Sequence, residues 1–243
     1  CLEHLDRSVG RLLAALDEMK IADRTAVFFI ADNGGVWERY RPVLAAVGKP
    51  SPKNLELMDR TFSYEPLRAG KGAAYEGGIR VPWIVRWPGV APRGVVNGTP
   101  VHVVDVMPTL LEMAGGRAPE GYVMDGVSLV PALRGRAMAQ RALYWYMPFY
   151  DLRWPAVPSA VMREGDYKLI ESFGDYVDLD RGAEYVIGAR LELFDLRKDP
   201  GENRNLAAAM PERARAMQRR LRAWIASCGA VVPGQNRSEE RRV

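Results

Sequence analysis

One apolar run, ended abruptly by polar residues and glycine, constrains the fold of this chain most. Residues 25–31 read Thr-Ala-Val-Phe-Phe-Ile-Ala, and Asp-Asn-Gly-Gly follows directly. An uninterrupted apolar run of this kind is typical of a strand covered on both faces of a mostly parallel sheet. The preceding residues 5–19 place their apolar side chains at helical spacing. A helix that leads into such a strand predicts the α/β class.

A second strand and a helix follow further along the chain. Residues 81–87 are mostly apolar and end at a Pro-Gly pair, which favours a strand followed by a turn. Asp105 then precedes an apolar segment that runs to Met113 and ends at a Gly-Gly pair. Aspartate at the start and glycine after the end are the ordinary boundary signals of a helix. We therefore expect a helix over residues 105–113, with Asp105 as its cap.

The pattern changes near residue 141. Short strand-like pieces replace the longer segments, and a last helix with Pro211 in its first turn closes the region. A Glu-Gly-Asp turn at residues 164–166 joins two of the pieces as a hairpin. These features predict a small antiparallel sheet with a helix packed on it. The four expected strands are residues 142–146, 160–163, 167–171 and 191–195.

These segments predict three regions. Residues 1–140 are expected to form an α/β domain, residues 141–226 an α+β subdomain, and residues 227–243 a disordered tail. Residues 36–66 contain prolines and show no clear period, which favours a long loop that covers a site. Trp37 and Tyr40 within it could stack on a sugar or aryl ring, or they could simply pack in the protein.

Composition excludes several classes of protein. With 48% hydrophobic and 26% charged residues, the 243-residue chain has the composition of a globular protein. It contains no run of about 18 apolar residues, so we expect no membrane span. The net charge of +4 hides arginines crowded towards the end of the chain, where glutamates are interspersed. This mixture favours a solvated helix face over a nucleic-acid patch, and we expect no nucleic-acid partner.

Asp32 and Asn33 are the first candidate ligands. They stand at the carboxyl end of the first strand, where open α/β sheets place their ligands. Carboxylate and amide oxygens suit a hard cation such as Ca²⁺ or Mg²⁺. Two ligands do not make a complete site, and the alternative is a plain Asn-Gly turn with Asp32 capping it.

Lys71 is the second candidate. Gly70 and Gly72 flank it, so that the backbone could approach a ligand closely while the ammonium group supplies a charge for an anion. The alternative is an ordinary surface lysine. The following Glu-Gly-Gly-Ile-Arg-Val-Pro, residues 76–82, predicts a tight turn into a strand, with Glu76 and Arg80 paired.

Taken in order, these segments resemble a type I sulfatase, an arylsulfatase-like and formylglycine-dependent member of the alkaline phosphatase superfamily. The resemblance runs from about residue 2 to residue 226 and covers the family's C-terminal portion. The motifs that carry it are Val-Gly-Arg-Leu-Leu at 9–13, Asp-Asn-Gly-Gly at 32–35, Leu-Arg-Ala-Gly-Lys-Gly at 67–72, Glu-Gly-Gly-Ile-Arg-Val-Pro at 76–82, Asp-Val-Met-Pro-Thr-Leu-Leu at 105–111, Asp-Gly-Val-Ser-Leu at 125–129, Glu-Gly-Asp-Tyr-Lys-Leu-Ile at 164–170, Leu-Phe-Asp-Leu at 193–196, Asp-Pro-Gly-Glu at 199–202 and Asn-Leu at 205–206.

The resemblance implies the fold and the chemistry. The fold is expected to be part of an alkaline-phosphatase-like mixed sheet flanked by helices, with a small C-terminal antiparallel sheet and helix. The reaction is hydrolysis of a sulfate ester, of a small molecule or a carbohydrate, to an alcohol and inorganic sulfate. Asp32 and Asn33 would be two of the Ca²⁺ ligands, and Lys71 would contact the sulfate oxygens as a catalytic residue.

The sequence departs from the family at the nucleophile. The family oxidises a cysteine or serine within Cys/Ser-x-Pro/Ala-x-Arg to formylglycine, and neither Cys1 nor Cys228 stands in that motif. We expect formylglycine and further metal ligands in a segment N-terminal to these residues, and no activity from these 243 residues alone. Two alternatives remain open: a phosphodiesterase or phosphonate hydrolase of the same superfamily, and a non-catalytic remnant that acts as a binding or folding module. The physiological substrate, the compartment and the oligomeric state are left open.

Overall fold

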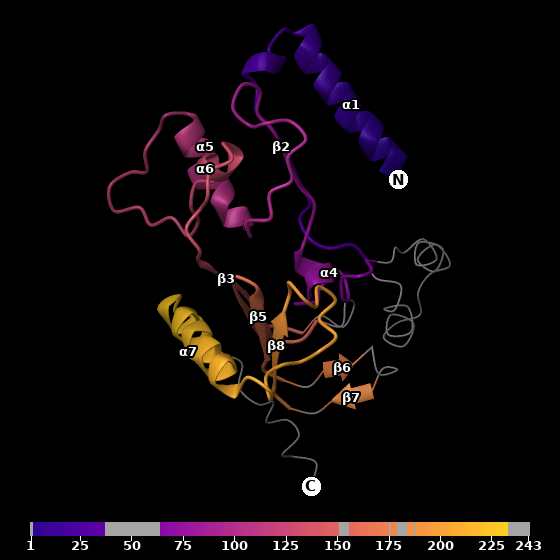
Figure 1. Cartoon of the computed structure of the whole chain (residues 1–243), viewed down its shortest axis with the longest axis vertical. Helices are drawn as coiled ribbons and strands as arrows, with labels where there is room; N and C mark the ends of the chain where they lie inside the picture. Colours follow the sequence, from indigo (N-terminus) through magenta and orange to yellow (C-terminus); the bar gives the residue numbers. More distant parts are fainter. Residues whose placement is uncertain are drawn as a thin grey trace. The chain divides into compact units, whose positions relative to one another are not determined.

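The structure, a computed structural model, forms two compact units (Figure 1). Unit 1 comprises Cys1–Ile30 and Pro82–Ala139, and unit 2 comprises Ala31–Val81 and Gln140–Val243. The predicted division at residue 140 stays a prediction. Trp37, Tyr40 and most of the predicted loop and tail lie outside the described residues. The described residues are 2–36, 64–150, 156–174, 176–178, 184–186 and 188–232.

Unit 1 begins with the predicted helix and strands. Helix α1 spans Leu2–Glu18, the short helix η1 spans Ala22–Arg24, and strands β1 (Val27–Ile30) and β2 (Trp83–Arg86) pair with each other. The pairing is antiparallel and β1 is half-buried, whereas its apolar run favoured a parallel strand covered on both faces. An apolar run indicates that a strand has apolar neighbours. The direction of the strand relative to its partner depends instead on how the chain connects the two strands.

A buried aspartate fixes the second helix of unit 1. Helix α5 (Val106–Met113) follows the short helix η3 (Val103–Asp105), as the boundary signals predicted. Asp105 is fully buried, but its carboxylate does not cap α5. It accepts hydrogen bonds from the backbone N–H groups of His102, at 2.8 Å, and of Val127, at 3.0 Å. Asp105 therefore ties the segment before α6 (Val130–Leu133) to the start of α5.

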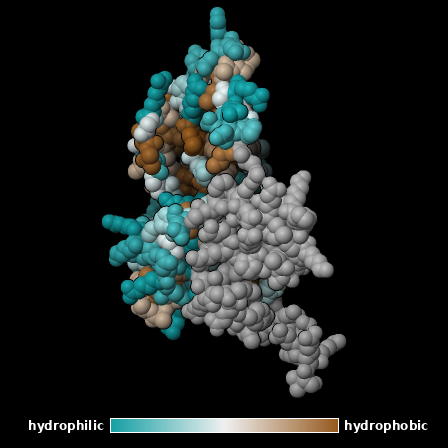
Figure 2. Space-filling model, turned by 90° about the vertical axis from the view of Figure 1, so that its right-hand side faces the viewer, coloured by the Kyte–Doolittle hydropathy of each residue, from teal (hydrophilic) through white to brown (hydrophobic). Residues whose placement is uncertain are grey.

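Unit 1 leaves much apolar surface exposed among the described residues. Helix α1 buries none of its residues, although its apolar residues recur at helical spacing. Leu12 on α1 is 69% exposed, and Met107 and Leu110 on α5 are 57% and 44% exposed. Figure 2 shows hydrophobic residues gathered on the upper part of the visible face. Extended apolar surface of this kind is typical of a face that packs against other protein segments.

Unit 2 is built around a four-stranded antiparallel sheet in the order β3-β4-β5-β8. Figure 1 labels β3, β5 and β8 of this sheet. The antiparallel pairing of β4 with β5 around Gly165, which has φ +57°, confirms the predicted hairpin. The four predicted strands are all present in this sheet. Two further strands form a separate ribbon, and a long helix follows the last described strand. The bounds are β3 Ala142–Met147, β4 Ser159–Glu164, β5 Tyr167–Ser172, β6 Tyr176–Asp178, β7 Glu184–Val186, β8 Arg190–Asp195 and α7 Pro211–Ser227.

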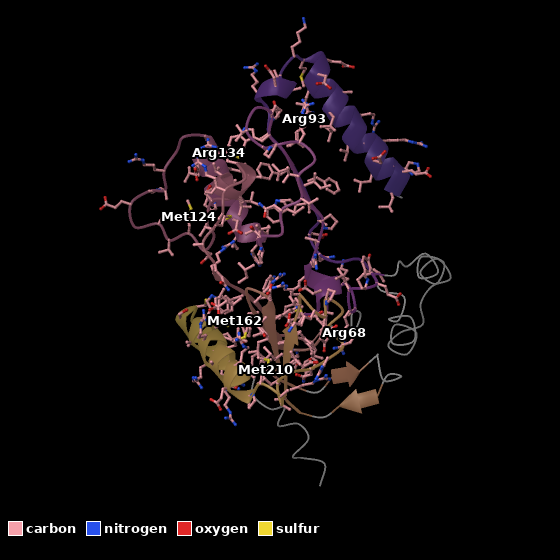
Figure 3. The ribbon with its side chains drawn as sticks, in the orientation of Figure 1. Arg68, Arg93, Met124, Arg134, Met162 and Met210 are labelled. Carbon is pink, nitrogen blue, oxygen red and sulfur yellow. The ribbon has the colours of Figure 1, made fainter. Side chains whose placement is uncertain are left out.

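Helix α7 covers one face of this sheet. Met162 is fully buried in the core between them, and Met210 packs against the edge of that core (Figure 3). Every second residue of the strands packs against the apolar stripe that the sequence predicted on α7. This packing buries side chains of both the sheet and the helix. The buried members are Ala160, Met162, Leu169 and Leu193 from the sheet, and Ala214, Met217, Leu221 and Ile225 from α7.

Three arginines of α7 contact side chains of the sheet. Arg220 binds Glu164 through two hydrogen bonds of 2.6 and 2.7 Å, which hold the pKa of that carboxyl below its usual range. Arg222 binds Glu171, and Arg213 lies 4.0 Å from the centre of the Tyr167 ring. These contacts support the interpretation of a charged helix face over that of a nucleic-acid patch. Among the helices described, none has both the length and the apolar character to cross a membrane.

Candidate functional site

The second face of the sheet in unit 2 carries the loop that contains Lys71. Residues 68–75, here called the Lys71 loop, lead into the short helix α4 (Glu76–Ile79). Tyr75 meets the ring of Phe194 edge-on with 6.3 Å between ring centres, and Ile79 packs on the same core. The apolar members of this face are Val161, Ile170, Phe194 and Leu196.

Close backbone packing shapes the Lys71 loop. Gly77 donates its N–H to the carbonyl oxygen of Arg68 at 2.8 Å, which closes the loop at its base. A Cβ atom at Gly77 would lie 2.2 Å from the carbonyl oxygen of Ala69, and a Cβ at Gly78 would lie 2.1 Å from that of Ala73. Both contacts are with backbone, so neither can be relieved by a side-chain rotation. The Gly-Gly pair is therefore required by the loop itself.

The turn that carries Asp32 and Asn33 is hydrogen-bonded to this loop. Residues 32–35, here called the Asp32 turn, donate the N–H of Gly34 to the carbonyl oxygen of Gly78 at 2.8 Å. In return, the N–H of Lys71 donates to the carbonyl oxygen of Gly35, also at 2.8 Å. A Cβ at Gly34 would lie only 1.9 Å from the carbonyl oxygen of Gly77. The structure thus joins the turn that carries Asp32 and Asn33 to the loop that carries Lys71, through the backbones of Gly34, Gly35, Lys71 and Gly78.

The Asp32 turn presents oxygen atoms of the kind that a hard cation prefers. Asp32 is exposed and accepts the N–H of Asn33 on Oδ1 at 2.9 Å, which leaves Oδ2 outside this turn contact. Asn33 donates its side-chain amide to the carbonyl oxygen of Gly34 at 2.7 Å, so Oδ1 is the acceptor atom that it offers. The geometry is that of the predicted turn, and its donor set fits Ca²⁺. The described residues contain no cluster of three or more histidine, cysteine or acidic side chains suited to a metal.

The sequence interpretation missed a buried ion cluster next to the loop. Lys168 on β5 is fully buried, with Nζ 3.0 Å from Oε1 of Glu76 and 2.8 Å from Oε1 of Glu202. The other oxygen of Glu202 accepts the N–H of Glu76 at 2.6 Å. The predicted pair of Glu76 with Arg80 is present at 3.9 Å, but Arg80 is largely exposed. Arg163 lies 3.7 Å from the same carboxylate. Lys168, at 3.0 Å and fully buried, is therefore the nearest of these three counter-charges of Glu76.

A second buried contact joins the loop to β8. The Tyr75 hydroxyl donates to Oε2 of Glu192 at 2.7 Å, and burial, with Glu192 second, raises the pKa of this hydroxyl well above its usual value. The Arg68 guanidinium lies 3.9 Å from the centre of the Tyr75 ring and 3.7 Å from Glu192. Arg68 and Tyr75, at the two ends of the loop, are thus fixed to the same glutamate.

Comparison with known proteins identifies the family. The sulfatase family model matches residues 1–116, and the model of the N-sulphoglucosamine sulphohydrolase C-terminal region matches residues 70–227, more than half of the chain. The chain belongs to the sulfatase family. The two matches overlap over residues 70–116, which include Lys71, whereas Asp32 and Asn33 lie in the first match alone.

Named relatives agree with this assignment. A sulfatase from Formosa agariphila is 35% identical over 92% of this chain, and the mouse steryl-sulfatase is 35% identical over 88% of it. Human arylsulfatase A is 32% identical over 89% of the chain. This chain spans 38% of the Formosa protein, 34% of steryl-sulfatase and 41% of arylsulfatase A.

Solved structures confirm the predicted fold class. The protein Ps i-CgsB in complex with k-i-k-neocarrahexaose has a TM-score of 0.65 at 25% identity, over 90% of this chain and 40% of its own length. The phosphonate monoester hydrolase from Silicibacter pomeroyi has a TM-score of 0.59 at 23% identity, over 91% of this chain and 38% of its own. The fold is therefore shared by sulfatases and phosphonate hydrolases, and fold alone does not choose between their reactions.

Proposed function

We propose that this chain is the C-terminal part of a sulfuric ester hydrolase that cleaves a sulfate ester to an alcohol and inorganic sulfate. The observation that carries the proposal is the hydrogen-bonded assembly of the Asp32 turn and the Lys71 loop. This assembly joins a pair of oxygen ligands to a lysine. The relatives that match most of this chain are sulfatases.

The residues take distinct roles in this proposal. Asp32 and Asn33 would hold Ca²⁺ as part of its shell of about six to eight oxygen ligands. When bound, the ion supplies positive charge that neutralises sulfate oxygens. The Lys71 ammonium binds and orients the sulfate group and compensates negative charge as the bond from sulfur to the ester oxygen breaks. The nucleophile, formylglycine, is expected outside these residues, because no Cys/Ser-x-Pro/Ala-x-Arg motif occurs among them.

The proposed substrate is a sulfate ester of a small molecule or a carbohydrate. Two structural relatives support the carbohydrate case. One was solved with k-i-k-neocarrahexaose, and another, at 22% identity, was solved with its substrate D-glucosamine-2-N,6-O-disulfate. The lysine and the hard-cation ligands suit any anionic ester, so the alcohol part of the substrate would be chosen by other residues.

The test compares three esters with the protein expressed from the natural reading frame that contains these residues. We expect turnover of an aryl sulfate to exceed that of an aryl phosphonate monoester and of a phosphate diester. Preference for the phosphonate or the diester would assign the chain to the alternative enzymes. Binding without turnover of any ester would instead support the non-catalytic alternative. A matched arm uses the isolated 243-residue polypeptide, in which we expect no turnover because the nucleophile motif is missing from it.

Replacement of Asp32 by alanine is expected to weaken Ca²⁺ binding at least about tenfold, because the affinity of such sites follows the number of charged ligands. Calorimetric titration of the chelator-treated natural protein measures this directly. Asp23→Ala, which removes an exposed aspartate in η1, is the matched control and should leave the affinity unchanged. Equal affinities in the two variants would remove Asp32 from the metal site.

A further inference from the structure

Both ends of the Lys71 loop are held by groups from the C-terminal part of unit 2. At the first end, Nη1 of Arg68 donates to the backbone carbonyl oxygen of Glu202 at 3.2 Å. At the other end, the Glu76 carboxylate accepts a hydrogen bond from Nζ of Lys168, and the backbone N–H of Glu76 donates to the Glu202 carboxylate. Glu202 therefore contacts the first residue of the loop, Arg68, and the residue that follows the loop, Glu76.

The fully buried lysine in this cluster needs an explanation beyond stability. Two buried carboxylates and a buried ammonium group lose their hydration on folding, and well-packed apolar side chains of similar volume often stabilise a protein as much or more. The cluster does something that apolar side chains cannot, because its hydrogen bonds, from Lys168 to Glu76 and from the N–H of Glu76 to Glu202, are directional. Nζ of Lys168 joins Glu76 to Glu202 through two contacts of 3.0 and 2.8 Å, which fix the loop end against β5.

Backbone strain lies at the same places. Ala69 has φ +60° and Glu202 has φ +53°, a region in which residues other than glycine are rare. Ala69 stands two residues before Lys71, and Arg68, its neighbour, binds the carbonyl oxygen of Glu202. Strained backbone persists only where the surrounding contacts hold it, and it is concentrated at functional sites. The cluster supplies contacts of that kind.

The turn that carries Glu202 is itself fixed. Asp199 donates its N–H to the carbonyl oxygen of Asp195 at the end of β8, at 2.8 Å. Its carboxylate accepts the side-chain amide of Asn203 at 3.1 Å and the N–H of Arg204 at 2.8 Å. Glu202 thus projects from a turn whose shape is set on both sides, and it can act as a fixed point for the loop.

We propose that Glu202 and Lys168 are positioning residues for the anion-binding lysine. Through Glu76 and Arg68 they hold the Lys71 loop in its strained conformation and so set where the Lys71 ammonium can lie. The inference rests on the proposed function, in which Lys71 binds sulfate. It assigns a catalytic purpose to residues that touch neither substrate nor metal.

The first test measures how firmly the loop is held and needs no activity. Glu202→Gln keeps an oxygen that can accept the N–H of Glu76 but removes the charge that faces Lys168. We expect amide hydrogen exchange in residues 68–78 to become about tenfold faster in this variant, because the local opening of that segment becomes easier. The amides of Lys71 and Gly77, which donate within the assembly, are the informative ones.

The control is Glu164→Gln, which removes a carboxylate from an exposed ion pair with Arg220 on the other face of the same sheet. Exchange in the Lys71 loop should stay at the wild-type rate in this control. Wild-type exchange of the loop in Glu202→Gln would overturn the inference. Equal acceleration in the loop and in β3 and β4 would overturn it as well, because the role would then be general stability.

The second test couples Glu202 to Lys71 in the active natural protein. Glu202→Gln alone should lower kcat/KM for the sulfate ester about 10- to 100-fold, the usual loss when a supporting residue is removed or a reacting group is misplaced. In the Lys71→Ala background the same change should cause almost no further loss, because its effect acts through that lysine. Independent, additive losses would contradict the inference.

The two tests also separate failure of the inference from failure of the proposed function. If Lys71→Ala alone leaves turnover unchanged, the assigned role of Lys71 is wrong, and with it the catalytic purpose of the cluster. The exchange experiment then still decides whether Glu202 anchors the loop. If Lys71→Ala abolishes turnover while Glu202→Gln changes neither exchange nor kcat/KM, the proposed function stands and the positioning role is lost.

Discussion

Lys71→Ala is expected to lower kcat for a sulfate ester about 10²- to 10³-fold in the natural protein, the usual cost of removing one group that stabilises developing charge. Charge on the sulfate group and the leaving oxygen changes most in the transition state, so the loss should fall mainly on kcat and less on KM. Steady-state kinetics with an aryl sulfate, at equal concentrations of folded protein for each variant, measure both constants.

Two variants make this result specific to Lys71. Lys71→Arg keeps the positive charge but replaces a compact ammonium with a planar fork, so we expect partial recovery of kcat relative to alanine. Lys198→Ala removes an exposed lysine, 83% accessible, from the same unit and should leave kcat unchanged. Full activity of Lys71→Ala would remove the lysine from the proposed mechanism, and an equal loss in Lys198→Ala would point to a nonspecific effect of charge.

The helices and the C-terminal sheet were predictable because their signals are local. The apolar residues of α7 recur every three to four positions, so the face that packs on the sheet could be identified without knowledge of the sheet. The turn at Gly165 likewise marked the β4–β5 hairpin from a few neighbouring residues. The direction of β1 was not predictable in this way, because it depends on pairing with β2 more than fifty residues later in the chain.

The candidate site was predictable only in part. The resemblance pointed to Asp32, Asn33 and Lys71, but spacing along the chain does not show that the Asp32 turn and the Lys71 loop are hydrogen-bonded to each other. The physical signal for that assembly is the glycine content: Gly34 and Gly77 approach each other too closely for any side chain. The glycines in these two segments are needed for one close backbone contact, but the sequence does not show that they lie together.

The ion cluster could not be predicted from local pattern. Lys168 stands beside a hairpin turn, where a lysine normally faces solvent, and its partner Glu76 is 92 residues away. Pairing of the strands places Lys168 beside Phe194 and Ile170 beside Glu192, on the face opposite α7. That register decides that Lys168 is buried, and register depends on the whole sheet.

Lys168→Met is expected to lower the free energy of unfolding by about 3–5 kcal/mol, the usual cost of removing one member of a buried ion group. The variant keeps most of the side-chain volume but leaves Glu76 and Glu202 buried with no cation between them. Urea unfolding followed by circular dichroism measures the change, and an unchanged m-value shows that it reflects stability. Arg220→Gln, which breaks an exposed pair, is the control and should cost less than about 1 kcal/mol.

The dependence of this loss on pH tests its electrostatic origin. Burial already raises the pKa of Glu202, and Lys168 opposes that rise. Without Lys168 the folded-state pKa of Glu202 should rise further above the unfolded value of about 4.3. At a pH between the unfolded-state and the folded-state pKa of Glu202, the native state holds a proton that the unfolded state has lost. The stability of Lys168→Met should therefore increase as the pH falls from 7 towards 5. If Lys168→Met lowers the free energy of unfolding by the same amount at pH 7 and at pH 5, the cause is poor packing and not uncompensated charge. In that case, adding Glu202→Gln to Lys168→Met should restore none of the lost stability.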